Sequence, residues 1–155
     1  MRPLTETKPK PLIEVRGKPL LAYHLEALVA AGFDDIVVNA SYLSGQIADF
    51  CGDGSRWGCR ITLSLEPEPL ETAGGIRHAL DRLGPEPFAV INADVFTDFP
   101  FQRLQRLALT DDVAHVIMTP NPPHHVAGDF HVFEGRITAN RGPRATFSGL
   151  SLIHI

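Results

Sequence analysis

The sequence Asn92-Ala93-Asp94 places a carboxylate directly after a short apolar run at residues 88–91. An apolar strand that delivers a carboxylate at its carboxyl end is a recurrent way of holding Mg²⁺ against a substrate phosphate. Asp94 is therefore a candidate metal ligand. An Asp after a strand also occurs in turns and helix caps, so the residues alone leave a purely structural role open.

A second candidate is the amino-terminal segment, in which Lys8 and Lys10 alternate with Pro9 and Pro11. Proline rings fix φ and oppose helix formation, so the segment is stiff enough to aim an ammonium group at a phosphate. The alternative, which composition alone favours, is a solvated basic tail, because charged termini are commonly disordered.

The sequence Glu-Thr-Ala-Gly-Gly at residues 71–75 lies where a loop passes into a helical pattern. Glycines at such a point let backbone N–H groups approach a ligand closely. The alternative is an ordinary helix start with Thr72 as its cap. Farther along the chain, Asp129 and Ser148 are polar residues among β-rich segments. The simplest interpretation of such residues is that they lie exposed in loops.

The cysteines and histidines give no sign of a metal centre. Cys51 and Cys59 lack the second ligand pair of a structural zinc site, and two cysteines in 155 residues make no disulfide scaffold, so we expect two free thiols. His124, His125 and His131 lie in or near a Pro-rich connection without metal-ligand spacing, and we expect exposed loop histidines.

The elements that must position these residues alternate between helix and strand. Helical spacing of leucines predicts a helix over 19–31, with Pro19 in its first turn and Gly32 as its stop. The remaining predictions are strands at 35–40, 59–65 and 88–91 and helices at about 43–50 and 72–83. Such alternation is typical of a mostly parallel α/β sheet, whose ligands collect at the carboxyl ends of the strands.

The second half of the chain is richer in strands. After a predicted helix at 101–109, β-rich segments follow at 113–118, 129–133 and 146–153. There is no internal repeat, low-complexity tract or linker, so we expect residues 1–155 to form a single domain.

Length and charge exclude several classes of protein. The chain has 155 residues, a net charge of −4 and 44% hydrophobic residues, which suits one domain with a sizeable core. A mildly acidic chain has no broad basic field for nucleic acid. It also lacks a membrane-spanning apolar run and a signal peptide, so we expect a soluble, cytoplasmic protein with no membrane partner.

Eight motifs, in this order along the whole chain, resemble the sugar-1-phosphate nucleotidyltransferases. They are P-L-T-x-x-x-P-K-P-L at 3–12, G-K-P-L at 17–20, D-G-S-R-W-G at 53–58, L-E-T-A-G-G-I at 70–76, N-A-D at 92–94, N-P-P-H-H at 121–125, G-D-F at 128–130 and T-F-S-G at 146–149. Within the family, the resemblance is greatest to the members that use UTP and N-acetylmuramate 1-phosphate in cell-wall recycling.

The resemblance implies a Rossmann-like nucleotidyltransferase (GT-A-like) fold and transfer of a uridylyl group from UTP to N-acetylmuramate 1-phosphate, which releases pyrophosphate. It implies that Lys10 contacts the nucleotide phosphates, Asp94 holds Mg²⁺, Asn92 contacts the sugar phosphate and Gly74 with its neighbours lines the nucleotide or sugar pocket. Weaker candidates on the sugar side are Glu71, Asp129 and Ser148. Two alternatives remain open: guanylyl or other nucleotidyl transfer to mannose 1-phosphate or a similar sugar, and a non-catalytic module that binds nucleotide or sugar.

The chain departs from the family pattern at Ala73 and Ala93, where glycine is usual, and at both ends. The resemblance implies that a hydrophobic first strand and a G-x-G-x-R loop before Met1 are missing, and that a second metal-binding Asp lies beyond Ile155. The first strand belongs in the middle of such a sheet. We therefore expect a partial domain that is poorly stable alone and at best weakly active.

Overall fold

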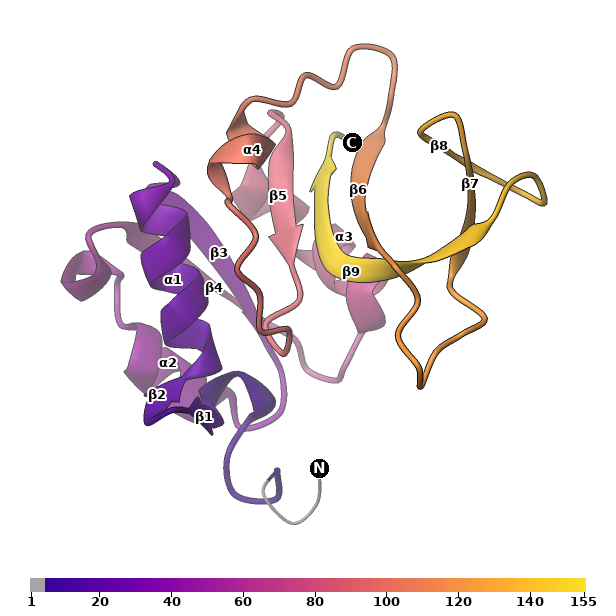
Figure 1. Ribbon diagram of the computed structural model, residues 1–155. Helices are drawn as coiled ribbons and strands as arrows, with labels where there is room; N and C mark the ends of the chain where they lie inside the picture. Colours follow the sequence, from indigo (N-terminus) through magenta and orange to yellow (C-terminus); the bar gives the residue numbers. More distant parts are fainter. Residues whose placement is uncertain (1–4) are drawn as a thin grey trace.

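The computed structural model describes residues 5–155, and its first half follows the predicted alternation closely (Figure 1). A short hairpin, β1 and β2, comes before the first helix. The elements are β1 (Glu14–Val15), β2 (Lys18–Pro19), α1 (Leu20–Ala30), β3 (Asp35–Ala40), α2 (Ser44–Cys51), β4 (Arg60–Leu65), α3 (Glu71–Leu83) and β5 (Phe88–Ile91). The predicted strands at 35–40 and 88–91 are confirmed with unchanged bounds, and the bounds of the helices α1, α2 and α3 differ from the predicted ones by at most one residue at each end.

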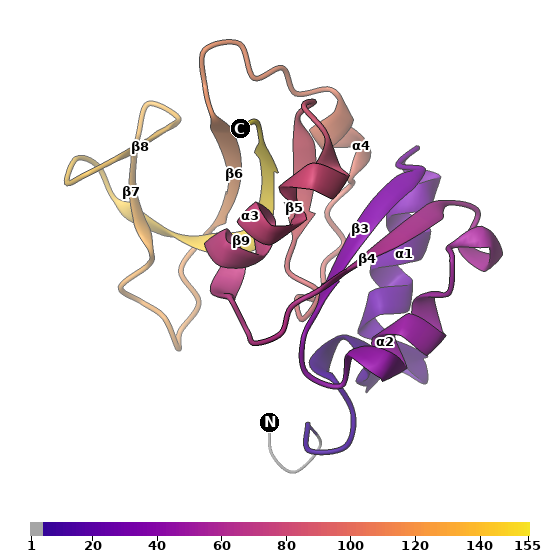
Figure 2. The same cartoon turned by 180° about the vertical axis from the view of Figure 1, so that it is seen from behind.

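The first core forms around the parallel pair β3–β4, whose register runs from Asp35 opposite Arg60 to Ala40 opposite Leu65. Buried apolar side chains of α1 and α2 pack on one face of this pair: Leu21, Leu25, Ile47 and Cys51, with Ile36, Val38, Ile61 and Leu63 beside them. The two views place α3 on the opposite side of the strands from α1 (Figures 1 and 2). This arrangement is the layering of an α/β fold.

The second half is organised around one long strand. The elements are α4 (Gln102–Gln105), β6 (Ala114–Thr119), β7 (Phe130–Phe133), β8 (Arg136–Thr138) and β9 (Arg144–Ile153). Strand β9 pairs with β5, β6 and β7, in each case antiparallel. A second core, with Leu28, Ala31, Phe101, Leu104 and Leu150 at its centre, joins α1 and α4 to this sheet.

The α/β class is confirmed, whereas the strand pairing differs from the expected mostly parallel sheet. Among residues 5–155, β3 with β4 is the one parallel pair, because β9 returns antiparallel to its neighbours. No strand of the described chain pairs with both β3 and β5, so the sheet is interrupted between them.

Several local predictions are corrected. Helix α4 is shorter than the expected 101–109. Helix α3 starts at Glu71 with no side-chain cap hydrogen bond, so Thr72 is not its cap. His131 lies in β7, where its Nδ1 is 2.7 Å from the Gly142 carbonyl oxygen, and not in an exposed loop.

Both cysteines are free, as expected. Within residues 5–155, no helix combines the length and apolar character that a bilayer crossing requires.

Candidate active site

Lys10 and Asp94, 84 positions apart in the sequence, meet at the carboxyl end of β5. Lys10 Nζ lies 3.7 Å from Asp94 Oδ2, and both side chains are about half exposed. The distance is that of an ion pair rather than of a hydrogen bond. Both charged groups are therefore open to a ligand that carries phosphates and a cation.

Lys10 is held by ordered backbone and not by a solvated tail. It opens the 3₁₀ helix η1 (Lys10–Leu12), in which the Leu12 N–H donates to the Pro9 carbonyl over 2.9 Å. Leu12 is buried in the first core. Upstream, the Tyr42 hydroxyl donates to the Glu6 carbonyl and Gln46 Nε2 donates to the Thr7 carbonyl.

The two lysines of this segment have different surroundings. Lys8 Nζ donates to Glu14 Oε1 over 2.8 Å, which leaves Lys10 as the lysine beside Asp94. The first two residues of the motif at 3–12, Pro3 and Leu4, lie outside the described residues.

Asn92 and Asp94 leave β5 through a tight turn fixed against β9. The Asn92 N–H donates to the Gly149 carbonyl, and the Val95 N–H donates to the Asn92 carbonyl. Gly149 has φ of +83°, and a Cβ there would come within 2.8 Å of Val95 Cγ2. Glycine is needed at this position, because a side chain would displace the turn that carries Asp94.

A cavity of about 580 Å³ lies beside Lys10, between the amino-terminal segment and the carboxyl end of β3. Its polar lining includes Lys10, Asn39, Ser41 and Tyr42, and Ala93 borders it from the β5 side. In open α/β sheets, ligands bind at the carboxyl ends of the strands, so both the place and the size suit a nucleotide.

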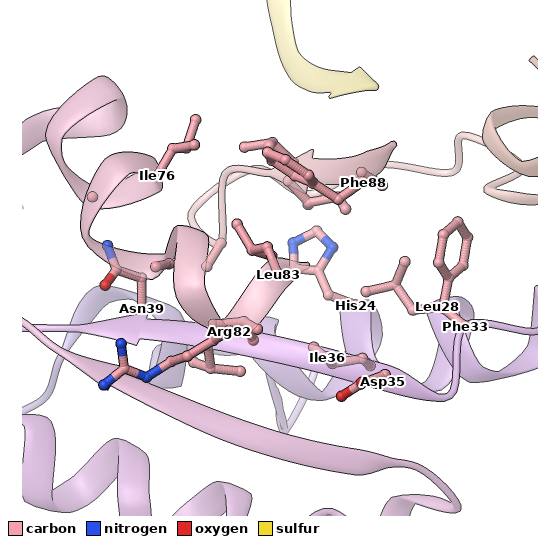
Figure 3. Close-up of a pocket in the computed structure, with 18 of the residues that line it drawn as sticks. His24, Leu28, Phe33, Asp35, Ile36, Asn39, Ile76, Arg82, Leu83 and Phe88 are labelled. Carbon is pink, nitrogen blue, oxygen red and sulfur yellow. The ribbon is translucent and has the colours of Figure 1, made fainter. Parts of the chain in front are cut away.

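A neighbouring cavity of about 460 Å³ lies between β3 and β5 and is lined mainly by apolar side chains (Figure 3). The two cavities share Leu21, Val38, Asn39 and Ala93. At this boundary, Asn39 Nδ2 donates to Glu66 Oε1, and the other Glu66 oxygen accepts from the Leu70 N–H. The Asn39–Glu66 link therefore ties β3 to the loop that enters α3.

Of the glycines at the start of α3, Gly75 rather than Gly74 faces a cavity. Gly75 lines the cavity between β3 and β5, and a Cβ on it would overlap Asn39 Nδ2 and Glu66 Oε1. Gly74 lies against Leu70 and lines neither of the two cavities. Glu71 is exposed, with φ of +59°. Sequence reasoning missed Glu66, whereas it included Gly75 as a neighbour of Gly74 in the Gly-Gly pair.

Asp129 is engaged within the protein. Its Oδ2 accepts from the Phe147 N–H over 2.8 Å, and its Oδ1 lies 3.0 Å from His125 Nε2. The Phe147 N–H, with a smaller contribution from His125, holds the pKa of Asp129 below its usual range. The carboxylate thus fastens the loop before β7 to β9.

Strand β9 brings Asp129, Ser148 and Asn92 into one region. Ser148 lies between Phe147, which bonds Asp129, and Gly149, which bonds Asn92. Ser148 Oγ is buried and has no hydrogen-bond partner among the described residues. A buried hydroxyl without a hydrogen-bond partner is unusual, and a hydroxyl or phosphate group of a substrate could supply the missing hydrogen bond.

The donor set suits a divalent cation held jointly with a substrate. Residues 5–155 contain no cluster of three or more His, Cys, Asp and Glu side chains able to hold a metal. Asp94 nevertheless presents a half-exposed carboxylate beside the cavity. Mg²⁺ commonly takes only one or two carboxylates and completes its shell with phosphate oxygens and water, so a lone Asp94 fits that mode.

Neither cysteine is a candidate nucleophile. Burial raises the pKa of the Cys51 thiol to about 11 and also raises that of Cys59. At neutral pH both remain protonated, and only a thiolate is reactive.

Known sequences resemble this chain over most of its length. The sequence model of the nucleotidyl transferase family matches residues 1–128. The chain is 47% identical to N-acetylmuramate alpha-1-phosphate uridylyltransferase of Neisseria meningitidis serogroup B, over 98% of this chain and 69% of that protein. It is also 43% identical to mannose-1-phosphate guanyltransferase of Hypocrea jecorina, over 67% of this chain and 29% of the relative.

Solved structures share the fold at low sequence identity. A glucose-1-phosphate thymidylyltransferase of Bacillus anthracis superposes with a TM-score of 0.86 at 17% identity, over 99% of this chain and 66% of that one. A UDP-glucose pyrophosphorylase gives a TM-score of 0.76 at 16% identity, over 99% of this chain and 71% of that one. At these identities the likeness establishes the Rossmann-like fold alone. The chain thus spans about two thirds of the length of each structure.

Proposed function

This chain belongs to the sugar-1-phosphate nucleotidyltransferases of the nucleotidyl transferase family, and we propose that it transfers a uridylyl group from UTP to N-acetylmuramate 1-phosphate. The choice of substrates is supported by the identity to the Neisseria meningitidis enzyme along almost the whole chain. A place in cytoplasmic cell-wall recycling is part of the same proposal.

The observation that carries the proposal is the meeting of Lys10 and Asp94 beside the cavity at the carboxyl ends of β3 and β5. In the reaction, a phosphate oxygen of the sugar phosphate attacks the α-phosphorus of UTP. A new P–O bond forms there, and the bond from the α-phosphorus to the oxygen it shares with the β-phosphorus breaks. Pyrophosphate leaves with that electron pair, so catalysis requires chiefly alignment and charge neutralisation.

Lys10 places its ammonium at the phosphates, where it offsets the charge that gathers on the leaving pyrophosphate. Asp94 would hold Mg²⁺ beside the substrate phosphates. When bound, that cation supplies further positive charge at the α-phosphate. The ion pair between Lys10 and Asp94 keeps both groups in place before the substrates arrive.

The remaining candidates act around this pair. Asn92 would contact the sugar phosphate from the turn after β5, and Ser148 would offer its partnerless hydroxyl to the same substrate. Asp129 would hold the part of β9 that carries Ser148 in place, because it accepts a hydrogen bond from the Phe147 N–H. Glu71 and Gly74, at the start of α3, are the weakest candidates for the sugar side.

A second candidate function is guanylyl transfer to mannose 1-phosphate, favoured by the 43% identity to the Hypocrea jecorina enzyme. That match covers 67% of the chain against 98% for the uridylyltransferase, so we place it second. A non-catalytic module that binds nucleotide or sugar is the third.

A coupled pyrophosphate assay separates these functions. The chain is supplied with Mg²⁺ and either UTP with N-acetylmuramate 1-phosphate or GTP with mannose 1-phosphate. The proposal predicts faster pyrophosphate release with the first pair. Faster release with the second pair would establish the alternative, and nucleotide binding without release from either pair would point to a binding module.

A further inference from the structure

Strand β9 begins with an arginine whose charge has no carboxylate partner among residues 5–155. Arg144 Nη2 donates to the Asp129 backbone carbonyl over 2.9 Å. The contact is with the backbone of Asp129 and not with its carboxylate, which accepts from the Phe147 N–H and lies against His125. Arg144 takes part in none of the ion pairs of the described residues. Its guanidinium therefore keeps N–H donors and a full positive charge for a ligand.

The two arginines nearest to it in the sequence have other contacts. Arg136 forms an ion pair with Asp112 over 2.6 Å. The Arg141 guanidinium stacks on the Phe133 ring, 3.6 Å from its centre. Within the described part of the β7–β9 sheet, Arg144 is thus the arginine that joins neither a carboxylate nor an aromatic ring.

Asp129 connects Arg144 to the sugar side of the candidate site. Its carbonyl accepts from Arg144, while its carboxylate accepts from the N–H of the residue before Ser148. The residue after Ser148 accepts from the Asn92 N–H. Arg144 and Asn92 therefore lie at the two ends of one stretch of β9, with the buried, partnerless Ser148 hydroxyl between them.

The length of this stretch suits a single sugar with a group on each side. Ser148 follows Arg144 by four positions in β9, which is about 13 Å along a strand. Figure 1 shows that β9 bends as it passes from β7 to β5, so the direct distance is shorter. Because the Arg144 side chain reaches Asp129, whose carboxylate is bonded next to Ser148, the guanidinium lies on the Ser148 side of its own backbone.

The sugar phosphate of the proposed reaction carries two anionic groups. In N-acetylmuramate 1-phosphate, the phosphate is on carbon 1 and a lactyl ether on carbon 3 ends in a carboxylate. With the phosphate at Asn92 and Asp94, that carboxylate lies across the ring from the reacting atoms. A guanidinium is the side-chain group that best matches a carboxylate, because it can donate two parallel hydrogen bonds.

We propose that Arg144 binds the lactyl carboxylate of N-acetylmuramate 1-phosphate and thereby selects this substrate over sugar phosphates without a second anion. The inference rests on the proposed function and names a residue that sets its choice of sugar. Arg144 contacts a part of the substrate that takes no part in phosphoryl transfer. Its removal should therefore change which sugar phosphate is bound and leave the phosphate site intact.

The nearby Asp129 carboxylate does not oppose this role. Both of its oxygens are engaged inside the protein, one with the Phe147 N–H and the other with His125. The carboxylate thus holds the wall of the site, and the side chain left to meet the lactyl group is that of Arg144.

The test compares two sugar phosphates that differ only in the lactyl ether. Dissociation constants of the full chain for N-acetylmuramate 1-phosphate and N-acetylglucosamine 1-phosphate are measured by NMR titration, with Mg²⁺ and the unreactive analogue α,β-methylene UTP present. We expect N-acetylmuramate 1-phosphate to bind about tenfold more tightly or better, as a hydrogen-bonded ion pair allows. Equilibrium binding is readable even where turnover is slow.

Three variants locate the preference. Arg144→Gln should abolish it by weakening N-acetylmuramate 1-phosphate alone, with N-acetylglucosamine 1-phosphate bound as before. Arg144→Lys retains the charge without the planar fork and should restore part of the preference. Arg141→Gln, three positions earlier and stacked on Phe133, is the matched control and should keep the preference in full.

Each contrary result has its own meaning. Equal weakening of both sugar phosphates in Arg144→Gln would assign Arg144 a structural role through Asp129 and overturn the inference, as would an unchanged preference. Equal binding of the two by the unaltered chain would overturn the inference and leave uridylyl transfer to a sugar phosphate standing. Binding of neither sugar phosphate would overturn the proposed function as well.

Discussion

The two halves of the molecule use their polar groups differently. In the half built on β3 and β5, Lys10, Asn39 and Asp94 gather at strand ends beside cavities, and each of the two strands has one edge without a strand partner among residues 5–155. In the half built on β9, the sheet is continuous, and polar side chains such as Asp129 and Asn121 bind the protein's own backbone.

This difference separates groups available for chemistry from groups that maintain the fold. Asp94 and Asp129 are both exposed carboxylates near strand ends. Asp129 accepts hydrogen bonds on both oxygens, whereas the one contact of this kind that Asp94 makes with the described part of the chain is a 3.7 Å ion pair. Substitutions in the first half should therefore mainly affect ligand binding and turnover, and those in the second half mainly stability.

The largest effect is expected from Asp94→Asn, which keeps the shape of the side chain and removes its charge. We expect pyrophosphate release to fall by about 10²-fold or more, since a charged group at a phosphoryl-transfer centre is commonly worth that much. The melting temperature should stay unchanged. Asp98→Asn, at an exposed carboxylate four residues away, is the matched control. A variant at Asp94 that retains Mg²⁺-dependent activity would refute its role.

Next in size is a pair of core substitutions that compares the two halves directly. Leu150 and Leu25 are each 1% exposed, but Leu25 borders the 460 Å³ cavity between β3 and β5 whereas Leu150 lies within the second core. Leu→Ala substitutions in cores cost about 2–5 kcal/mol. We expect the free energy of unfolding to fall by an amount near the upper value for Leu150→Ala and near the lower value for Leu25→Ala. The reason is that the Leu25 side chain already lacks neighbouring atoms on the side of the cavity. Equal losses in urea unfolding would show that the cavity between β3 and β5 is closed in solution.

Asp129→Ala should lower the melting temperature by removing the acceptor of the Phe147 N–H. The pKa of Asp129 is held below its usual range in the folded protein, so its contribution is complete above about pH 3.8 and is lost as the pH falls through the folded-state value. Acid unfolding of the variant should therefore begin from a lower stability and depend less on pH. An unchanged acid midpoint would argue for a role in substrate contact alone.

A smaller effect is expected from His24. Burial lowers its pKa, so below about pH 6.5 the unfolded chain binds more protons than the folded one. Stability should fall as the pH drops from about 6.5 through the folded-state pKa, and His24→Gln should reduce this fall. The exposed His124 gives the control substitution His124→Gln. Identical pH profiles for all three proteins would contradict the buried, neutral state of His24.

The sequence predicts best those elements that local pattern determines. The β-branched run at 35–40 and the apolar run at 88–91 became strands with the predicted bounds. Two hairpins were missed, at Arg16-Gly17 and Glu134-Gly135. In both, a non-glycine residue and the following glycine take positive φ, as two-residue hairpin loops require, and the non-glycine residue hid the signal.

Which strands pair with one another could not be predicted from the sequence. Nothing local to residues 144–153 says that this strand pairs antiparallel with β5, which lies more than fifty residues earlier. The candidate site was partly predictable, because Asp94 follows an apolar strand. The approach of Lys10 to it depends on Leu12 in the core and on the contacts of Tyr42 and Gln46, which only tertiary packing sets. Gly75 and Glu66 likewise become meaningful only once Asn39 lies beside them.

The most direct test of the phosphate site is UTP binding to Lys10→Ala compared with Lys8→Ala, measured by isothermal titration calorimetry in the presence of Mg²⁺. The two lysines share one segment, but Lys8 pairs with Glu14 while Lys10 lies beside Asp94. The account predicts that Lys10→Ala weakens UTP binding about tenfold or more, in line with the roughly 1.5–3 kcal/mol of a hydrogen bond to a charged group, and that Lys8→Ala leaves it unchanged. Equal affinity in the two variants would contradict it.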